Sequence, residues 1–125
     1  MMRVLLAPIV YMLAIWVLSS IPGGSLDIKG MDWLTAPTTQ NLLHIPLYGG
    51  LAYVWVVSLL RLNHTRPLVL AAVLTIAYGI VDEYHQSFVP GRYASVADVA
   101  LNCVGAGLVL WWGYWRQERW TTLAP

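Results

Sequence analysis

The residues of this 125-residue chain that suit chemistry lie in three short, well-separated runs. His44 stands in the first run, Glu83 in the second and Asp98 in the third. Imidazole titrates near neutral pH, and a neighbouring carboxylate tunes its basicity, so this trio suits general acid/base or nucleophilic catalysis. We therefore predict His44, Glu83 and Asp98 as candidate catalytic residues.

The same runs contain side chains that suit substrate binding. A guanidinium can hold a phosphate or carboxylate through paired hydrogen bonds, and amides or hydroxyls can orient the rest of a ligand. The candidate substrate-binding residues are Arg92, Gln86, Asn102, Tyr48 and Asn41. Each of them alone equally fits a structural role, such as an Arg92 ion pair with Glu83 or Asp98 that fastens two helices. Their expected clustering at one place favours a substrate-binding site.

No known cofactor motif accompanies these residues. The chain lacks a Ser-His-Asp motif, a P-loop and a metal-site signature, and its single cysteine, Cys103, excludes an internal disulfide and a cysteine-based zinc site. We therefore expect no cofactor and assign no metal ligand, while a hydrated metal ion on His44, Glu83 and Asp98 stays open as an alternative.

The composition indicates which elements position these residues. Hydrophobic residues make up 58% of the chain and charged residues 10%, whereas soluble domains carry about 25% charged residues. Seven Trp and seven Tyr accompany one Phe, and Trp and Tyr are the aromatic residues that favour membrane interfaces. The net charge of +1 gives no reason to expect a nucleic-acid partner. The sequence thus predicts an integral membrane protein.

Four apolar stretches predict a single all-α domain over residues 1–125, an integral membrane four-helix bundle. The helices are expected at about 4–20, 41–60, 67–88 and 95–115, since roughly 20 residues cross a ~30 Å hydrocarbon core. No small-x-small cleavage site follows the first stretch, so we expect it to be retained. The third stretch reaches full length only by including the polar residues Asp82, Glu83, His85 and Gln86.

The basic residues predict the orientation of this bundle. Arg3, Arg61, Arg66, Arg116 and Arg119 fall on one side of a four-pass arrangement, and Lys29 and Arg92 on the other. Because cytoplasmic loops are enriched in Lys and Arg, both termini are expected inside. The 21–40 loop and the polar residues then face the extracytoplasmic side of a bacterial cytoplasmic membrane.

The predicted topology brings the polar residues to one depth. His44 lies near the outer end of the second helix, Glu83 near that of the third, and Asp98 and Asn102 in the first turns of the fourth. At about 100° per residue, Asn41, His44 and Tyr48 also share one face. The dipeptide at 90–91, Pro-Gly, predicts a turn, and Ser95 is the expected N-cap of the fourth helix.

Two motifs in these runs resemble those of the VanZ-like family. Residues 82–92 read DEYHQSFVPGR, which is similar to the family's Glu-x-x-Gln followed by a Pro-Gly-Arg turn. The Asp and Asn-x-x-Gly that follow in the family match Asp98, Asn102 and Gly105. The Asn41-x-x-His44-x-x-x-Tyr48 run resembles the helix 2 signature, with Asn41 near the place where the family usually has Lys. The resemblance implies a multi-pass envelope protein from a family named for a link to teicoplanin resistance.

Three function classes remain open. The first is an enzyme acting on an anionic lipid or lipid-linked cell-wall precursor at the outer leaflet, and the second is a non-catalytic binder of a lipid, a glycopeptide or a partner protein. The third, a small transporter, is disfavoured because transport sites lie at mid-membrane depth. We expect membrane lipids as partners and no nucleic acid, and the sequence leaves the reaction and the oligomeric state open.

Overall fold

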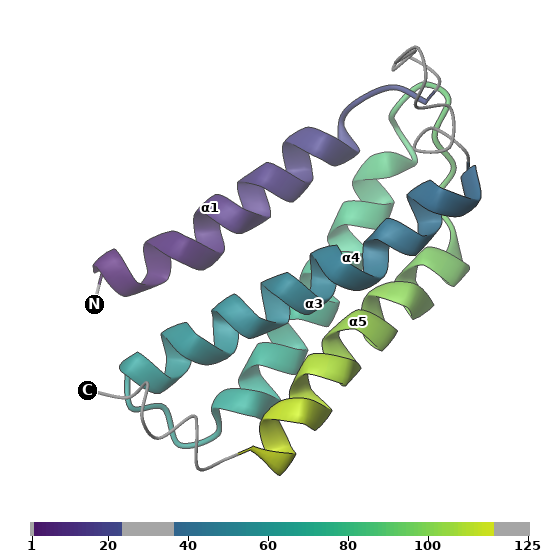
Figure 1. Cartoon of the computed structure of the whole chain (residues 1–125). Coiled ribbons are helices and arrows are strands. Elements are labelled where there is room, and N and C mark those ends of the chain that lie inside the picture. Colours follow the sequence, from purple (N-terminus) through teal and green to yellow (C-terminus); the bar gives the residue numbers. More distant parts are fainter. Residues whose placement is uncertain (1, 24–36, 117–125) are drawn as a thin grey trace, which may run out of the picture.

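The computed structural model of this chain describes residues 2–23 and 37–116 (Figure 1). These ranges contain four helices and no strand: α1 (Met2–Ser19), α3 (Pro37–Arg61), α4 (Pro67–Gln86) and α5 (Val96–Trp115). The predicted all-α bundle of four helices is therefore confirmed. Lys29, Arg119 and most of the 21–40 loop, which entered the orientation argument, lie outside the described residues.

Three of the helices are long and apolar enough to cross a membrane, with spans at Gln40–Arg61, Pro67–Gln86 and Val96–Trp115. The apolar helix α1 is shorter, since its 18 residues rise about 27 Å. Large apolar side chains project outward from the bundle, among them Leu13, Val17, Val69, Leu108 and Trp111. A surface of this kind requires lipid rather than water, which agrees with a membrane protein.

The helix boundaries differ from the predicted ones by two or more residues at three ends, and α1 begins at Met2 rather than at 4. Helix α3 begins at Pro37, four residues early, because proline is tolerated in the first turn, where its missing N–H has no helical partner. Helix α4 ends at Gln86 rather than at 88. There the Phe88 N–H donates to the His85 carbonyl at 3.0 Å, a tightened turn that closes the helix before Pro90.

Helix α3 forms the centre of the bundle. Both α3 and α4 pack against the three other described helices, but α3 makes the more extensive contacts with α5 and α1, whereas α1 contacts only α3 and α4 among the described helices. The core accordingly has two parts along α3, one where Val56 meets Ala71 of α4 and one where Tyr48 and Leu51 meet Ile15 of α1. The peripheral α1 therefore covers one side of α3 and α4 without touching α5 (Figure 1).

The closest approach within the bundle is between α3 and α5. A Cβ atom at Gly105 would overlap the backbone carbonyl of Ile45, and one at Gly49 would lie 3.1 Å from the Gly105 carbonyl oxygen. Small residues of this kind allow helix backbones to meet directly in membranes. The contact draws the middle of α5 against the N-terminal half of α3.

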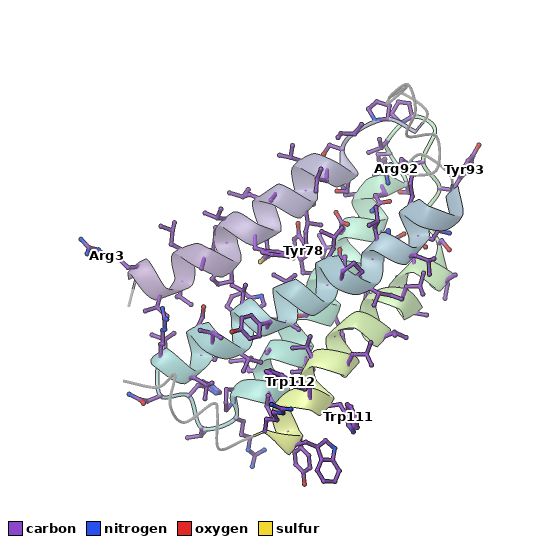
Figure 2. All side chains as sticks on the ribbon, in the orientation of Figure 1. Arg3, Tyr78, Arg92, Tyr93, Trp111 and Trp112 are labelled. Carbon is purple, nitrogen blue, oxygen red and sulfur yellow. The ribbon has the colours of Figure 1, made fainter. Side chains whose placement is uncertain are left out.

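One end of the bundle gathers the predicted polar residues, and Figure 2 shows Arg92 and Tyr93 there, with Arg3, Trp111 and Trp112 toward the other end. At the polar end, the turn after α4 is joined to the segment after α1, because the Gly23 N–H donates to the Pro90 carbonyl at 3.0 Å. Gly91 in this turn has φ +74, a conformation that favours glycine. The turn thereby places Arg92 over the end of α1.

Candidate functional site

Two consecutive residues of α4, Asp82 and Glu83, carry buried carboxylates, with exposed fractions of 1% and 4%. Because consecutive residues of a helix point about 100° apart, the two carboxylates meet different neighbours. Asp82 faces α1 and α3, and Glu83 faces α3 and the start of α5. The polar end of the bundle therefore contains two distinct clusters.

The Glu83 carboxylate is held from one side. Its Oε2 accepts a hydrogen bond from the Ser95 backbone N–H at 3.1 Å. Its Oε1 lies 3.9 Å from Nδ1 of His44 and has no hydrogen-bond partner within the described ranges. Oε1 of the buried Glu83 carboxylate is thus left available to a ligand.

His44 joins this cluster from α3. Its Nδ1 lies 2.8 Å from Oδ1 of Asn102, which is 1% exposed on α5. In the neutral ring a proton on Nδ1 leaves the lone pair on Nε2. Gly79 makes room for the contact, because a Cβ there would lie 3.0 Å from Nδ2 of Asn102. The sequence-based prediction that His44 and Asn102 come together thus matches the structure.

Asp98 completes the first cluster from the first turn of α5. Ser95 caps this helix as predicted, since its Oγ accepts the Ala97 N–H at 3.1 Å. The spacing Ser95-x-x-Asp98 is that of a capping box, in which the acidic side chain would accept the N–H of the cap residue. Here Glu83 accepts that N–H instead, and Oδ1 of Asp98 stays buried with no partner among the described residues.

His44, Glu83 and Asp98 therefore converge from three helices. One potential ligand atom from each lies within 4.8 Å of the other two. These are the three residues that the sequence predicts as catalytic, and we call them, with Asn102, the Glu83 cluster. An imidazole beside two carboxylates can accept, donate or relay a proton, or hold a cation.

The second cluster surrounds Asp82 and is hydrogen-bonded throughout. Its Oδ1 accepts from the Ser19 hydroxyl at 2.6 Å, and its Oδ2 accepts from the Tyr48 hydroxyl at 3.0 Å and from Nε2 of Gln86 at 3.1 Å. We call these four residues the Asp82 network. Asp82 and Ser19 are absent from the predicted site residues, although the spacing of Asp82 and Gln86, four residues apart on one helical face, was a usable signal.

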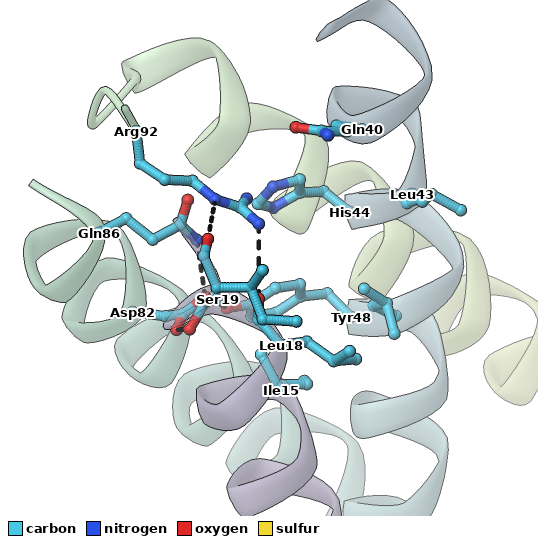
Figure 3. Close-up of a pocket in the computed structure, with 12 residues that line it drawn as sticks. Ile15, Leu18, Ser19, Gln40, Leu43, His44, Tyr48, Asp82, Gln86 and Arg92 are labelled. Carbon is cyan, nitrogen blue, oxygen red and sulfur yellow. Dashed lines mark hydrogen bonds between the residues drawn. The ribbon is translucent and has the colours of Figure 1, made fainter. Parts of the chain in front are cut away.

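A pocket of about 180 Å³ lies between α1, α3 and α4 (Figure 3). Its polar lining comes from both clusters, from the first turns of α3 and from the turn after α4: Ser19, Gln40, His44, Tyr48, Asp82, Gln86 and Arg92. Its apolar lining comes from α1, the segment after it and α3: Ile15, Leu18, Ile21, Leu43 and Leu47. His44 belongs both to the pocket wall and to the Glu83 cluster, so it connects the two.

Arg92 covers one end of this pocket (Figure 3). Its Nε donates to the Ile21 carbonyl at 3.1 Å and its Nη2 to the Leu18 carbonyl at 3.4 Å. The ion pair with Glu83 or Asp98 that the sequence left open does not form in the described structure. The carbonyls at a helix C-terminus lack helical partners and carry partial negative charge, so they attract the guanidinium instead.

Asn41 lies apart from the other predicted binding residues. It is exposed, whereas the pocket face of α3 is formed by residues 40, 43, 44, 47 and 48. This face follows the helical repeat, and Asn41 falls just outside it. Gln40 occupies the pocket-lining position that the sequence assigned to Asn41.

Comparison with known proteins gives one positive result. A family model described as VanZ/LLP1 matches residues 4–116. No curated protein and no solved structure matches this chain significantly. The matched region contains both clusters and the pocket.

Proposed function

We propose that this chain, which belongs to the VanZ-like family, binds the headgroup of an anionic membrane lipid or lipid-linked cell-wall precursor. The binding site is the pocket between α1, α3 and α4. The observation that carries the proposal is the division of this pocket into a polar end with Arg92 and apolar walls from α1 and α3.

The apolar walls fit an amphiphile because they reach the outer surface of the bundle. Leu18 on α1 is 48% exposed and Leu43 on α3 is 41% exposed, and both line the pocket. An acyl or polyprenyl chain can therefore contact these exposed leucines while its headgroup occupies the pocket. The pocket volume of about 180 Å³ is below the ~300 Å³ of the smaller drug-binding sites, which suits a headgroup rather than a whole lipid.

The polar end supplies the anion selectivity. Arg92 uses two N–H groups on the carbonyls of Leu18 in α1 and of Ile21 just after it, and a guanidinium has five, so further donors are available to a phosphate or carboxylate. Gln86 and Tyr48 line the same space and help to orient the ligand. Because Arg92 is fastened to α1, binding also depends on the position of that helix.

The orientation of the pocket supports an extracytoplasmic ligand. Arg3, Arg61, Arg66 and Arg116 belong to the helix ends opposite the pocket, the arrangement in which that opposite end is cytoplasmic. The pocket then faces the outer leaflet, where lipid-linked cell-wall precursors are used. The family's link to teicoplanin resistance agrees with a ligand of this kind.

The reaction, in the enzymatic form of this proposal, is acid/base or nucleophilic chemistry at His44. Its ring lines the pocket, Asn102 contacts Nδ1, and Glu83 stands 3.9 Å from the same atom. This arrangement orients the ring for proton transfer. In the non-catalytic form, the same pocket holds the lipid and His44 only shapes its wall.

Mass spectrometry of copurifying lipids tests the binding claim. The protein is purified in mild detergent as wild type, as Arg92→Ala and as Arg61→Ala, a matched control in which an exposed arginine of the opposite end is removed. We expect one anionic lipid class to be enriched in wild type and Arg61→Ala. Its loss in Arg92→Ala should be roughly 10- to 100-fold, since hydrogen bonds to charged groups contribute about 1.5–3 kcal/mol. Equal lipid content in all three proteins would contradict the proposal.

The variant His44→Gln separates the enzyme from the binder. Glutamine keeps a polar side chain but cannot exchange a proton near neutral pH. An enzyme should retain the lipid in this variant and accumulate it in unprocessed form. A binder should carry the same lipid species as wild type.

A further inference from the structure

The Glu83 cluster contains more negative charge than its protein neighbours balance. Glu83 is 4% exposed and Asp98 is 6% exposed. In the described part of the chain no Lys or Arg side chain pairs with either, because Arg92 is directed to the carbonyls of Leu18 and Ile21 at the end of α1 and just after it. A buried carboxylate is stable when hydrogen bonds satisfy it as they do Asp82, when it is paired with a cation, when it coordinates a metal or when it is protonated.

Unpartnered polar atoms mark the same place. Within the described ranges, Oε1 of Glu83 and Oδ1 of Asp98 are buried acceptors without a donor. Asn102 is 1% exposed and contacts His44 through Oδ1, while its Nδ2 also lacks a partner. Buried polar groups in native proteins are nearly always satisfied, so a cluster of exceptions requires an explanation.

The spacing of the cluster suits one ion. Ligand atoms of His44, Glu83 and Asp98 all lie within 4.8 Å of one another. Ligands bound to Zn²⁺ at about 2.0–2.2 Å, or to a larger cation at about 2.3–2.6 Å, lie at most about 4–5 Å apart. Small side-chain movements therefore bring the three residues into a common coordination sphere.

We propose that His44, Glu83 and Asp98 bind one divalent metal ion of the Zn²⁺ or Mn²⁺ class. One imidazole with two carboxylates is a mixed nitrogen and oxygen ligand set, which suits these ions. Three protein ligands leave at least one coordination position open. Because the ring of His44 also lines the pocket, the site that these residues would form adjoins the pocket.

Outer contacts of the two ligand types support this assignment. The Ser95 N–H fixes Glu83 through Oε2, the oxygen that does not face His44, and the Asn102 amide contacts the ring of His44. Hydrogen bonds of this kind orient metal ligands in proteins. The capping-box spacing Ser95-x-x-Asp98 supports the metal site as well. Glu83, and not Asp98, accepts the Ser95 N–H, so the Asp98 carboxylate is left available to the ion.

The inference goes beyond the proposed lipid binding and can stand without it. When bound, the ion would attract an anionic oxygen of a headgroup and acidify a coordinated water. Arg92 would hold another part of the same anionic group. The chain's own residues bind the ion, orient the ligand and cover the pocket.

Metal binding is tested on full-length protein purified in detergent without a polyhistidine tag. The protein is stripped with a chelator, dialysed against Zn²⁺ or Mn²⁺ and analysed by elemental mass spectrometry. We expect one ion per wild-type chain and an affinity lowered by more than about 100-fold in Glu83→Gln and Asp98→Asn. Asn102→Ala, which removes an outer contact, should lower it by about 10–100-fold.

Two controls keep the result interpretable. Asp82→Asn changes the neighbouring carboxylate of α4 and should bind the ion as wild type does, and Tyr48→Phe serves as a second control if Asp82→Asn does not fold. Arg92→Ala should lose the lipid and keep the ion, so failure of one proposal is distinguishable from failure of the other. A wild type that binds neither ion, or equal losses in Glu83→Gln and Asp82→Asn, would overturn the metal site.

Discussion

Asp82 and Glu83 are adjacent in one helix and equally hidden from solvent, yet their surroundings are opposite. Asp82 accepts hydrogen bonds from α1, α3 and α4 and leaves no oxygen free. Glu83 accepts one backbone hydrogen bond and presents its second oxygen to His44 and Asp98. A satisfied carboxylate stabilises the fold, whereas an incompletely satisfied one is available to a ligand at a cost in stability.

The largest expected difference between the two regions is in stability. Asp82→Ala removes the acceptor shared by Tyr48, Gln86 and Ser19, and we expect it to lower the free energy of unfolding by about 3 kcal/mol. Glu83→Ala in metal-free protein removes a carboxylate that accepts one hydrogen bond, from the Ser95 N–H, so it should cost less, about 1 kcal/mol. Equilibrium unfolding in mixed micelles measures the stability of both variants. Equal destabilisation by the two substitutions would contradict the distinction between the two carboxylates.

A smaller loss of stability is expected from a substitution at the close approach of α5 to α3. Gly105→Ala places a methyl group against the carbonyl of Ile45, which should cost about 2 kcal/mol. It should also weaken metal binding without altering any ligand, because Asp98 and Asn102 move with α5. Gly107→Ala, with nothing within 4 Å of the added Cβ, is the matched control. If both variants bind the ion as wild type does, the close approach does not position the Glu83 cluster.

The smallest loss of stability is expected when a single hydrogen-bond donor of the Asp82 network is removed. Tyr48→Phe removes one of three hydrogen bonds to Asp82 and is expected to cost about 1 kcal/mol. Metal affinity should not change, because Tyr48 is outside the Glu83 cluster. Calorimetry and metal titration on the same preparation measure the two quantities, and a fall in metal affinity would show that the two regions are coupled.

The fold was predictable because four long apolar stretches require lipid and form helices there. The cap at Ser95 was predictable as well, since its signal is local. The convergence of His44, Glu83, Asp98 and Asn102 followed from helix length and topology alone. These features depend on short-range patterns or on the depth of a residue in the bundle.

The features that were missed depend on how the helices are rotated and packed. Ser19 contacts Asp82 across 63 positions of sequence, and α1 has no charged residue near its C-terminal end to signal that role. The carbonyls that hold Arg92 belong to the backbone, which sequence motifs do not show. Asn41 shares a stripe with His44, but a rotation of α3 places Gln40 in the pocket and leaves Asn41 outside.

Anomalous diffraction from crystals grown with Zn²⁺ tests most directly whether the two carboxylates differ as described. We predict one anomalous peak within about 2.0–2.2 Å of a ring nitrogen of His44, an oxygen of Glu83 and an oxygen of Asp98. No peak should appear beside Asp82. A peak at Asp82, or none at the Glu83 cluster in protein saturated with the ion, would contradict the account.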